Sequence, residues 1–188
     1  EEWKRFDRIF EENVLELGFD EQKNEIYLVY MMTDAIESIL VLEQAVMTGE
    51  SFVARKIKAD MILYSPLLRA ADTAKHISDI TGIPAREEMR LIEQNFGVWE
   101  GTSPRNSHEF YEAKKGFVQR FGSGESMFQL AQRIYNLLDE LKADSDKTYI
   151  LVAHNGIARI VCSYFKDMTN DEFAAYGVAN CSITEFEF

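Results

Sequence analysis

The sequence predicts an α/β domain with three layers, in which a mostly parallel sheet is flanked by helices on both faces. Two short runs, Glu25–Tyr30 and Tyr149–Ala153, are almost entirely apolar or aromatic, as strands covered on both faces usually are. Amphipathic helical patterns separate the predicted strands, and this alternation is typical of parallel β-α-β connections. A chain of 188 residues is long enough for about one domain with a shared core.

The first segment of the chain predicts a helical extension. Over residues 3–17, apolar side chains recur at steps of three and four, the spacing of an amphipathic helix, and Gly18 follows as its stop. We therefore expect residues 1–24 to form an N-terminal helical extension and residues 25–188 to form one domain.

The next part of the chain alternates strand and helix patterns. Buried strands are expected at Glu25–Tyr30 and over residues 60–64. Between them, residues 34–58 are rich in helix formers. Thr48 and Gly49 interrupt this pattern, which predicts two helices or one interrupted helix.

The remaining elements are predicted in the same way. Helices are expected over residues 67–81, 108–121, 126–141 and 157–165, an irregular polar segment over 88–101, and strands at Tyr149–Ala153 and over 182–188. The helix over 126–141 has a strongly periodic inner face, made of Leu130, Ile134, Leu137, Leu138 and Leu141.

The composition excludes several classes of function. The 32 Asp and Glu residues outnumber the 20 Lys and Arg residues and give a net charge of −12. This charge repels nucleic acids and anionic membranes, so we expect neither as a partner, and an anionic ligand needs a local basic pocket. Cys162 and Cys181 are too few for a disulfide scaffold and fit a reducing compartment. No apolar run reaches about 18 residues, and Glu1 does not begin a signal peptide, so we expect a cytoplasmic protein.

Polar side chains follow two of the predicted strands, where a buried sheet has no packing reason to place them. Arg69 lies in the first turn of the helix after the second strand, beside free backbone N–H groups, and this combination suits a phosphate. His154 directly follows a later strand, with Asn155 and Gly156 as a small pair that tolerates unusual backbone angles. Ligands of open α/β sheets bind at the carboxyl ends of strands. Taken singly, however, Arg69 is equally a surface arginine and His154 a structural histidine.

The irregular segment over 88–101 is a third candidate region. It combines carboxylate, amide and aromatic side chains with two glycines, and loops of this composition often carry function. Glu93 is its first candidate acid and Glu100 the second.

Together these motifs resemble those of the histidine phosphatase superfamily, also called phosphoglycerate-mutase-like. The segments that carry the resemblance are Ile26-Tyr27-Leu28-Val29, Ser65-Pro66-Leu67-Leu68-Arg69-Ala70 with Thr73-Ala74, Glu93 with Phe96-Gly97-Val98-Trp99-Glu100-Gly101, Gly124-Glu125-Ser126 with Arg133, and Val152-Ala153-His154-Asn155-Gly156 with Arg159. They occur in the family's order. The resemblance implies a phosphoglycerate-mutase-like fold and phosphoryl transfer or hydrolysis of a small phosphomonoester through a phosphohistidine, with no metal or other cofactor.

The resemblance also implies roles for single residues. Arg69 is expected to clamp the phosphate, His154 to be the second histidine of the pocket with Asn155 as a further phosphate ligand, and Glu93 to protonate the leaving oxygen. These roles are physically sensible, because a phosphoryl group in transit spreads negative charge that fixed cationic donors such as Arg69 and His154 can stabilise. A departing alkoxide needs a proton, which a nearby carboxylic acid supplies. Glu100 is the less suitable neighbour of Glu93.

The sequence departs from this family at the end of its first strand. There the family has an Arg-His-Gly signature that supplies the attacking imidazole, whereas this chain has Tyr30-Met31-Met32. The thioether of Met31, at the position of the nucleophile, cannot form a phosphoramidate and carries no charge. Either this segment of the chain is missing or altered, or the protein is a natural pseudoenzyme that has lost the catalytic strand end.

The other histidines are poor substitutes for a nucleophile. His76 lies well inside a helix, about two turns beyond Arg69, and His108 lies near a helix start, where it caps the helix or belongs to a lid. If His154 itself attacked the phosphorus, no histidine would remain to stabilise the charge of the phosphoryl group.

Two hypotheses follow. The first is a phosphate pocket around Arg69, Glu93 and His154 that binds a small phosphorylated metabolite with impaired turnover. The second is a noncatalytic interaction or scaffold module that uses the helix over 3–17 as its contact surface, and a homodimer is compatible with either. The substrate itself is not readable, since the resemblance assigns specificity to the variable region over 103–121.

Overall fold

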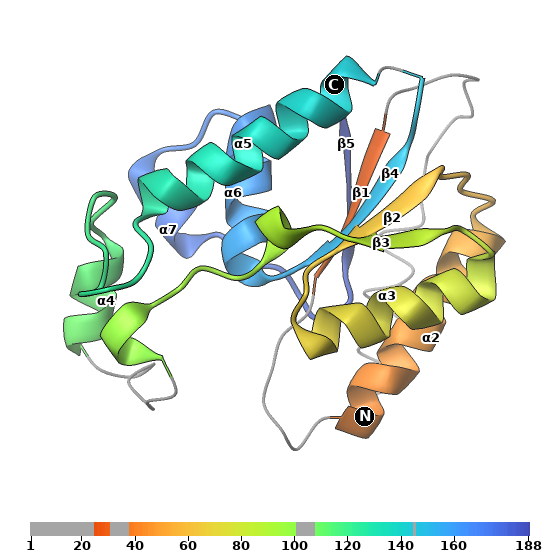
Figure 1. Cartoon of the computed structure of the whole chain (residues 1–188), viewed down its shortest axis with the longest axis horizontal. Coiled ribbons are helices and arrows are strands. Elements are labelled where there is room, and N and C mark those ends of the chain that lie inside the picture. Colours follow the sequence, from red (N-terminus) through yellow and green to blue (C-terminus); the bar gives the residue numbers. More distant parts are fainter. Residues whose placement is uncertain (1–24, 31–37, 101–107, 145) are drawn as a thin grey trace.

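A five-stranded sheet forms the centre of the chain, with helices on both of its faces (Figure 1). This computed structural model describes residues 25–30, 38–100, 108–144 and 146–188. The strands are β1 (Glu25–Tyr30), β2 (Met61–Tyr64), β3 (Ala85–Glu87), β4 (Tyr149–Ala153) and β5 (Ile183–Glu187), in the spatial order β3-β2-β4-β1-β5. The helices are α2 (Ser38–Ala54), α3 (Leu68–Thr81), α4 (His108–Lys114), α5 (Met127–Ala143), α6 (Asn155–Phe165) and α7 (Asn170–Ala175). Two short 3-10 turns, η1 (Met89–Leu91) and η2 (Gly97–Trp99), lie in the segment predicted to be irregular.

The sheet is mostly parallel, as predicted. β4 pairs in parallel with β1 and with β2, and β2 pairs in parallel with β3, while only β5 runs antiparallel, along β1. The sequence analysis missed β3, because its three residues are all exposed and give no apolar signal. The registers Tyr30↔Ala153 and Tyr64↔Val152 bring the carboxyl ends of β1, β4 and β2 to the same edge.

Side chains of the strands alternate between two apolar cores. On one face, Leu28 and Leu151 pack with α5 and α6, and on the other Val29 and Val152 pack with Phe52 of α2 and with α3. Figure 1 shows these two helical layers on opposite sides of the sheet. This alternation is the two-residue period of a strand covered on both faces. The predicted inner face of α5 is confirmed, since all five of its leucine and isoleucine side chains are buried.

Helix α2 is continuous through Thr48 and Gly49, so the predicted interruption is wrong. The Thr48 hydroxyl donates to the carbonyl of Gln44 one turn earlier, at 2.8 Å, and so causes no break. Gly49 lies against α3, since a Cβ there would lie 2.9 Å from Cδ1 of Ile80. The glycine therefore permits close contact between the two helices instead of ending one of them.

Helix ends follow local signals that the sequence carries. Gly82 ends α3 in the left-handed conformation, with φ of 74°. Ser126 begins α5 with a capping box in which Gln129 is the reciprocal partner. α4 stops at Lys114 and not near residue 121 as predicted, and α7 was not predicted because it has only 6 residues.

Three of the predictions fall on residues outside the described ones. These are the helix over 3–17, the N-terminal extension over 1–24, and Met31, which the sequence analysis expected at the position of a nucleophile. The predicted helix over 34–58 and the predicted specificity region over 103–121 are described only from residues 38 and 108 onward. Among the described helices, none combines the length and apolarity that a membrane span requires.

Candidate active site

The ends of β2 and β4 bring together a serine and a histidine that are 89 positions apart. Ser65 follows β2 and His154 follows β4, and the Ser65 hydroxyl lies 2.7 Å from Nε2 of His154. The Ser65 backbone N–H also donates to the carbonyl of Val152, at 3.0 Å, which extends the pairing of the two strands to the site. His154 is 1% exposed and Ser65 is fully buried, so the sheet itself fixes this contact.

The imidazole of His154 is held neutral by its surroundings. Burial is the main cause that lowers its pKa from the ordinary 6.5 to about 3, and the positive charges of Arg69 and Arg133 lower it further. A neutral imidazole differs from the cationic donor that the sequence analysis expected at His154. Its Nδ1 atom is buried and has no hydrogen-bond partner among the described residues.

Arg69 lies in the first turn of α3, as predicted. Its side chain is half-buried, and its charge acts on His154, which places the guanidinium within electrostatic reach of the imidazole. The helix around it is fixed locally, since the Thr73 hydroxyl donates to the carbonyl of Arg69 at 3.0 Å and the Leu67 N–H donates to the Ser65 hydroxyl at 3.4 Å. Ser65 thus connects the start of α3 with His154.

Glu93 lies at the N-terminus of α6, next to His154. Its carboxylate accepts from the backbone N–H of Gly156 at 3.2 Å and from that of Gln94 at 2.9 Å. A Cβ on residue 156 would overlap the carboxylate, so glycine is needed there for this close approach. The expectation that Gly156 serves an unusual backbone angle is wrong, because the residue belongs to α6, which begins at Asn155 instead of residue 157, and its φ is not positive.

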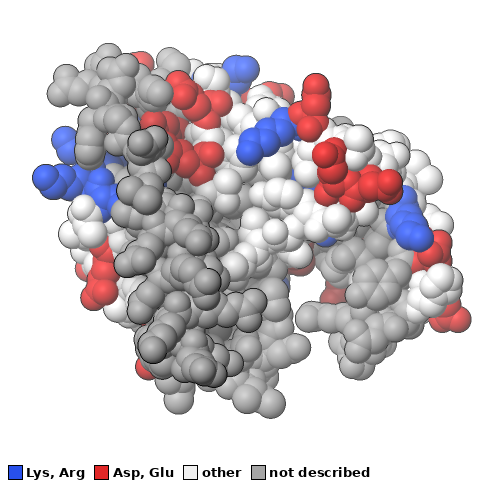
Figure 2. All heavy atoms as spheres, turned by 180° about the vertical axis from the view of Figure 1, so that it is seen from behind, with Lys and Arg blue, Asp and Glu red and all other residues white. Residues whose placement is uncertain are grey.

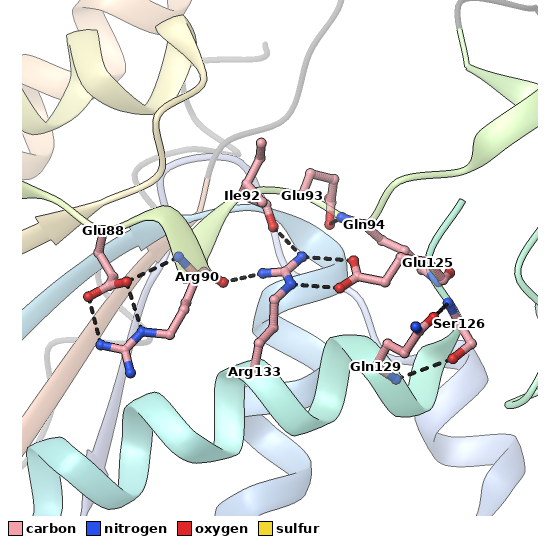
Figure 3. Close-up of polar contacts among 9 residues, drawn as sticks. All are labelled: Glu88, Arg90, Ile92, Glu93, Gln94, Glu125, Ser126, Gln129 and Arg133. Atoms are coloured by element: carbon pink, nitrogen blue, oxygen red, sulfur yellow. Dashed lines mark hydrogen bonds and ion pairs between the residues drawn. The ribbon is translucent and has the colours of Figure 1, made fainter. Parts of the chain in front are cut away.

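The loop that carries Glu93 is held by Arg133 of α5 (Figure 3). The Arg133 guanidinium donates to both carboxylate oxygens of Glu125, at 2.8 and 2.9 Å, and to the carbonyls of Ile92, at 2.7 Å, and of Arg90. The buried Gln94 side chain donates to the carbonyl of Glu125 at 3.0 Å. Contacts from α5 and from the residue before its N-cap thus fix the loop on both sides of Glu93.

The remaining predicted residues make fewer contacts with the site around His154 and Glu93. Asn155 is the first residue of α6, and its Oδ1 atom is buried without a hydrogen-bond partner among the described residues. Glu100 is exposed and accepts from the N–H of Phe96 at 2.6 Å, which is a local loop contact. His76 lies on α3 with Nδ1 2.7 Å from the carbonyl of Asp72, and His108 is exposed at the start of α4.

The structure therefore brings two contacts to the N-terminus of α6: Ser65 contacts His154, and Glu93 contacts Gly156 two residues further on. The positive charge of Arg69 acts on His154 as well. Over the described part of the chain, no group of three or more His, Cys, Asp or Glu side chains could hold a metal ion. On the face seen in Figure 2, acidic and basic side chains are intermixed, so an anion is attracted only close to particular cations.

The parallel sheet, with polar residues at its carboxyl edge, has the architecture of phosphoglycerate-mutase-like α/β proteins. The chain belongs to the histidine phosphatase superfamily (branch 1), because the model of that family matches residues 41–188, more than half of the chain. The match begins after β1, so the resemblance predicted for residues 26–29 lies outside it. A second family model, a domain of unknown function (DUF3878), matches residues 1–64 and covers only about a third of the chain.

Individual proteins that are similar to this chain support the assignment to this family. Glucosyl-3-phosphoglycerate phosphatase of Mycobacterium tuberculosis is 31% identical, over 76% of this chain and 70% of the relative. Phosphoserine phosphatase 1 of Hydrogenobacter thermophilus is 28% identical, over 65% of this chain, and the chain spans only 62% of that relative's length. A solved structure of the mycobacterial glucosyl-3-phosphoglycerate phosphatase in complex with inorganic phosphate superposes with a TM-score of 0.68, at 25% identity, over 87% of this chain and 88% of that chain.

Two features of the site were not assigned a role from the sequence. The sequence analysis names Ser65 only as part of a motif, although Ser65 directly follows β2 in the same way as His154 directly follows β4. It likewise names Glu125 and Arg133 only as parts of a motif. Their eight-residue separation gives no indication that the pair also contacts a loop more than 30 positions earlier.

Proposed function

We propose that this protein binds a small phosphomonoester with its phosphate beside His154, at the carboxyl ends of β2 and β4. The observation that carries the proposal is a buried imidazole whose Nδ1 atom has no partner among the described residues and on which the positive charge of Arg69 acts. An unsatisfied buried polar atom costs about 1–3 kcal/mol, which a hydrogen bond to a ligand removes. Positive charge and an unsatisfied donor together favour an anion.

Each donor of the proposed pocket suits a phosphate. The guanidinium of Arg69 offers a planar fork of N–H groups, and the N-terminus of α6 adds backbone donors and a favourable dipole. When the Ser65 hydroxyl donates to Nε2 of His154, the imidazole hydrogen resides on Nδ1. The neutral His154 then presents an N–H donor to the phosphate, and Asn155 is the further ligand in this arrangement.

Glu93 is the proposed proton donor to the leaving oxygen. It contacts the backbone of α6 two residues after His154, so its carboxyl group lies next to the proposed phosphate. A phosphate dianion beside a carboxylate favours the protonated carboxyl by charge repulsion. The protonated Glu93 can then give its hydrogen to the departing alkoxide.

We further propose that turnover is impaired. The chain contains three histidines, and we place Tyr30-Met31-Met32, by the resemblance of the sequence, where the family has its attacking imidazole. His76 and His108 have the local contacts and exposure described above, and His154 is engaged with Ser65. Loss of a nucleophile can cost on the order of 10⁶ in turnover, while binding through Arg69 does not depend on it.

Phosphate binding tests the first part of this proposal. Calorimetric titration with inorganic phosphate is expected to give saturable binding, and Arg69→Gln and His154→Gln are each expected to weaken it at least about tenfold, the equivalent of roughly 1.4 kcal/mol. His76→Gln is the matched control, because His76 is on the same helix as Arg69 and should change the affinity less than about twofold. Absence of saturable binding at millimolar phosphate would refute the proposed pocket.

Turnover of p-nitrophenyl phosphate tests the second part. We expect little hydrolysis by the unmodified protein and an increase of about 10³-fold or more in a variant with Tyr30→Arg, Met31→His and Met32→Gly. Rapid hydrolysis by the unmodified protein, unaffected by His154→Ala, would show that the site is elsewhere.

A further inference from the structure

Glu93 lies in a loop with little regular structure of its own. The single turn of η1 precedes it, and its carboxylate accepts from the backbone N–H groups of Gln94 and Gly156. A side chain in such a loop keeps one position only if the backbone around it is fixed from outside. Contacts from outside the loop must therefore fix the backbone next to Glu93.

Arg133 holds the backbone on the N-terminal side of Glu93. It reaches from α5 to the carbonyl of Ile92, the residue directly before Glu93, at 2.7 Å, and to the carbonyl of Arg90. Both partners are backbone atoms, so the contacts constrain the path of the loop and not the side chains of residues 90 and 92. Figure 3 shows the guanidinium of Arg133 between these carbonyls and Glu125.

Glu125 orients Arg133 and also holds the other side of Glu93. Its carboxylate accepts two parallel hydrogen bonds from the guanidinium, a geometry that fixes the plane of the arginine. Its backbone carbonyl accepts from Gln94 and its N–H donates to the carbonyl of Asn95, at 2.8 Å. Both charged side chains are only 19% exposed, so solvent screens the pair weakly.

A second ion pair on the same loop provides a contrast. The side chain of Arg90 contacts Glu88 at 2.8 Å and Glu140 of α5 at 2.8 Å, so it also ties the loop to α5. These contacts involve side chains only, and the side chain of Glu140 is 64% exposed. Arg90 therefore stabilises the loop without constraining the backbone next to Glu93.

We propose that Arg133, oriented by Glu125, is the positioning residue that holds the Glu93 carboxylate against the N-terminus of α6. The proposal rests on the proposed function for the role of Glu93 as proton donor. The dependence of the Glu93 position on Arg133 does not require that function. Arg133 touches neither substrate nor reacting atoms in this role.

Nuclear magnetic resonance of the Gly156 amide tests the proposal without phosphate or turnover. Because this N–H donates to Glu93, its chemical shift should change as Glu93 titrates, and Glu93→Gln defines the response when that titration is absent. In Arg133→Met we expect the pH-dependent shift to be lost, as in Glu93→Gln. In the matched control Arg90→Gln we expect the full wild-type response.

The double variant Glu125→Gln, Arg133→Met keeps the test decisive if Arg133→Met alone does not fold. It removes both charges, so that no carboxylate is left without its partner, and it should also lose the Gly156 response. A wild-type response in a folded Arg133 variant, or an equal loss in Arg90→Gln, would overturn the proposal. Absence of phosphate binding with an intact Gly156 response would contradict the proposed function and leave the positioning role of Arg133 in place.

Discussion

His154 and Glu93 both lie at the N-terminus of α6 but are held in different ways. His154 follows a central strand, is 1% exposed and contacts a serine at the end of the neighbouring strand. Glu93 lies in a loop whose position depends on an arginine, a glutamate and close backbone contacts from residues 121–125. The position of His154 is fixed by the sheet and therefore by the fold as a whole. The position of Glu93 depends on loop contacts that single substitutions can remove.

Loss of the loop contact at Gly97 should have the largest effect on stability. Gly97 has φ of 52°, and a Cβ there would overlap the backbone carbonyl of Phe121. We expect Gly97→Ala to lower the free energy of unfolding by about 3 kcal/mol. In the control Gly82→Ala, φ is 74° but no atom lies within 4 Å, so only the backbone term of about 1 kcal/mol is expected. Urea denaturation measures both, and equal losses would contradict the role of the loop contact.

Acid should destabilise the protein through His154. Its pKa is lowered from the ordinary 6.5 to about 3 in the folded chain. At a pH between these two values, His154 is protonated in the unfolded chain and neutral in the folded chain. Stability is therefore lost as the pH falls from about 6.5 toward 3. Between pH 7 and 4.5 the free energy of unfolding should fall by about 2–3 kcal/mol more in the wild type than in His154→Gln. Identical urea curves for the two proteins over this range would disprove the shift.

A methyl group at residue 156 should displace Glu93 with little global effect. Gly156→Ala removes the space for the carboxylate, yet alanine favours the helix, so we expect the free energy of unfolding to change by less than about 1 kcal/mol. The carboxyl carbon resonance of Glu93 should shift. Gly177→Ala is the control, because its Cβ would make only ordinary contact with Asn155, at 3.9 Å. An unchanged Glu93 resonance in Gly156→Ala would mean that the carboxylate does not depend on this glycine.

Removal of an exposed ion pair should have the smallest effect. Lys75 and Asp79 are one turn apart on α3, with side chains 69% and 61% exposed. Exposed pairs of this kind contribute about 0.3–0.5 kcal/mol, so Asp79→Asn should leave the urea midpoint nearly unchanged. A loss of unfolding free energy as large as that of Gly97→Ala would show that this exposed ion pair stabilises the protein as much as the buried loop contact at Gly97.

The sequence predicts the sheet-supported region well. The runs that form β1 and β4 are apolar on both faces, so their bounds and parallel pairing follow from composition and from the helices between them. His154 is found because it directly follows β4, and Arg69 because it lies in the first turn of the helix after β2. The same reasoning fails for β3, whose exposed residues have no pattern, and for the exact start of α6, since glycine at residue 156 suggests a turn.

The support of Glu93 could not be predicted from residue types. The ion pair of Glu125 and Arg133 serves Glu93 only because α5 crosses the loop at one particular place. That crossing depends on the packing of Leu130, Ile134 and their neighbours against the sheet. Periodicity predicts which face of α5 is buried, but it does not predict which backbone carbonyls its polar side chains reach.

The two edges of the sheet have a consequence for self-association. β3 is only three residues long and carries Arg86 and Glu87, while β5 carries Glu185 and Glu187. Short edges with charged side chains oppose the addition of a further strand from another molecule. A continuous intermolecular sheet that extends from β3 or β5 is therefore disfavoured.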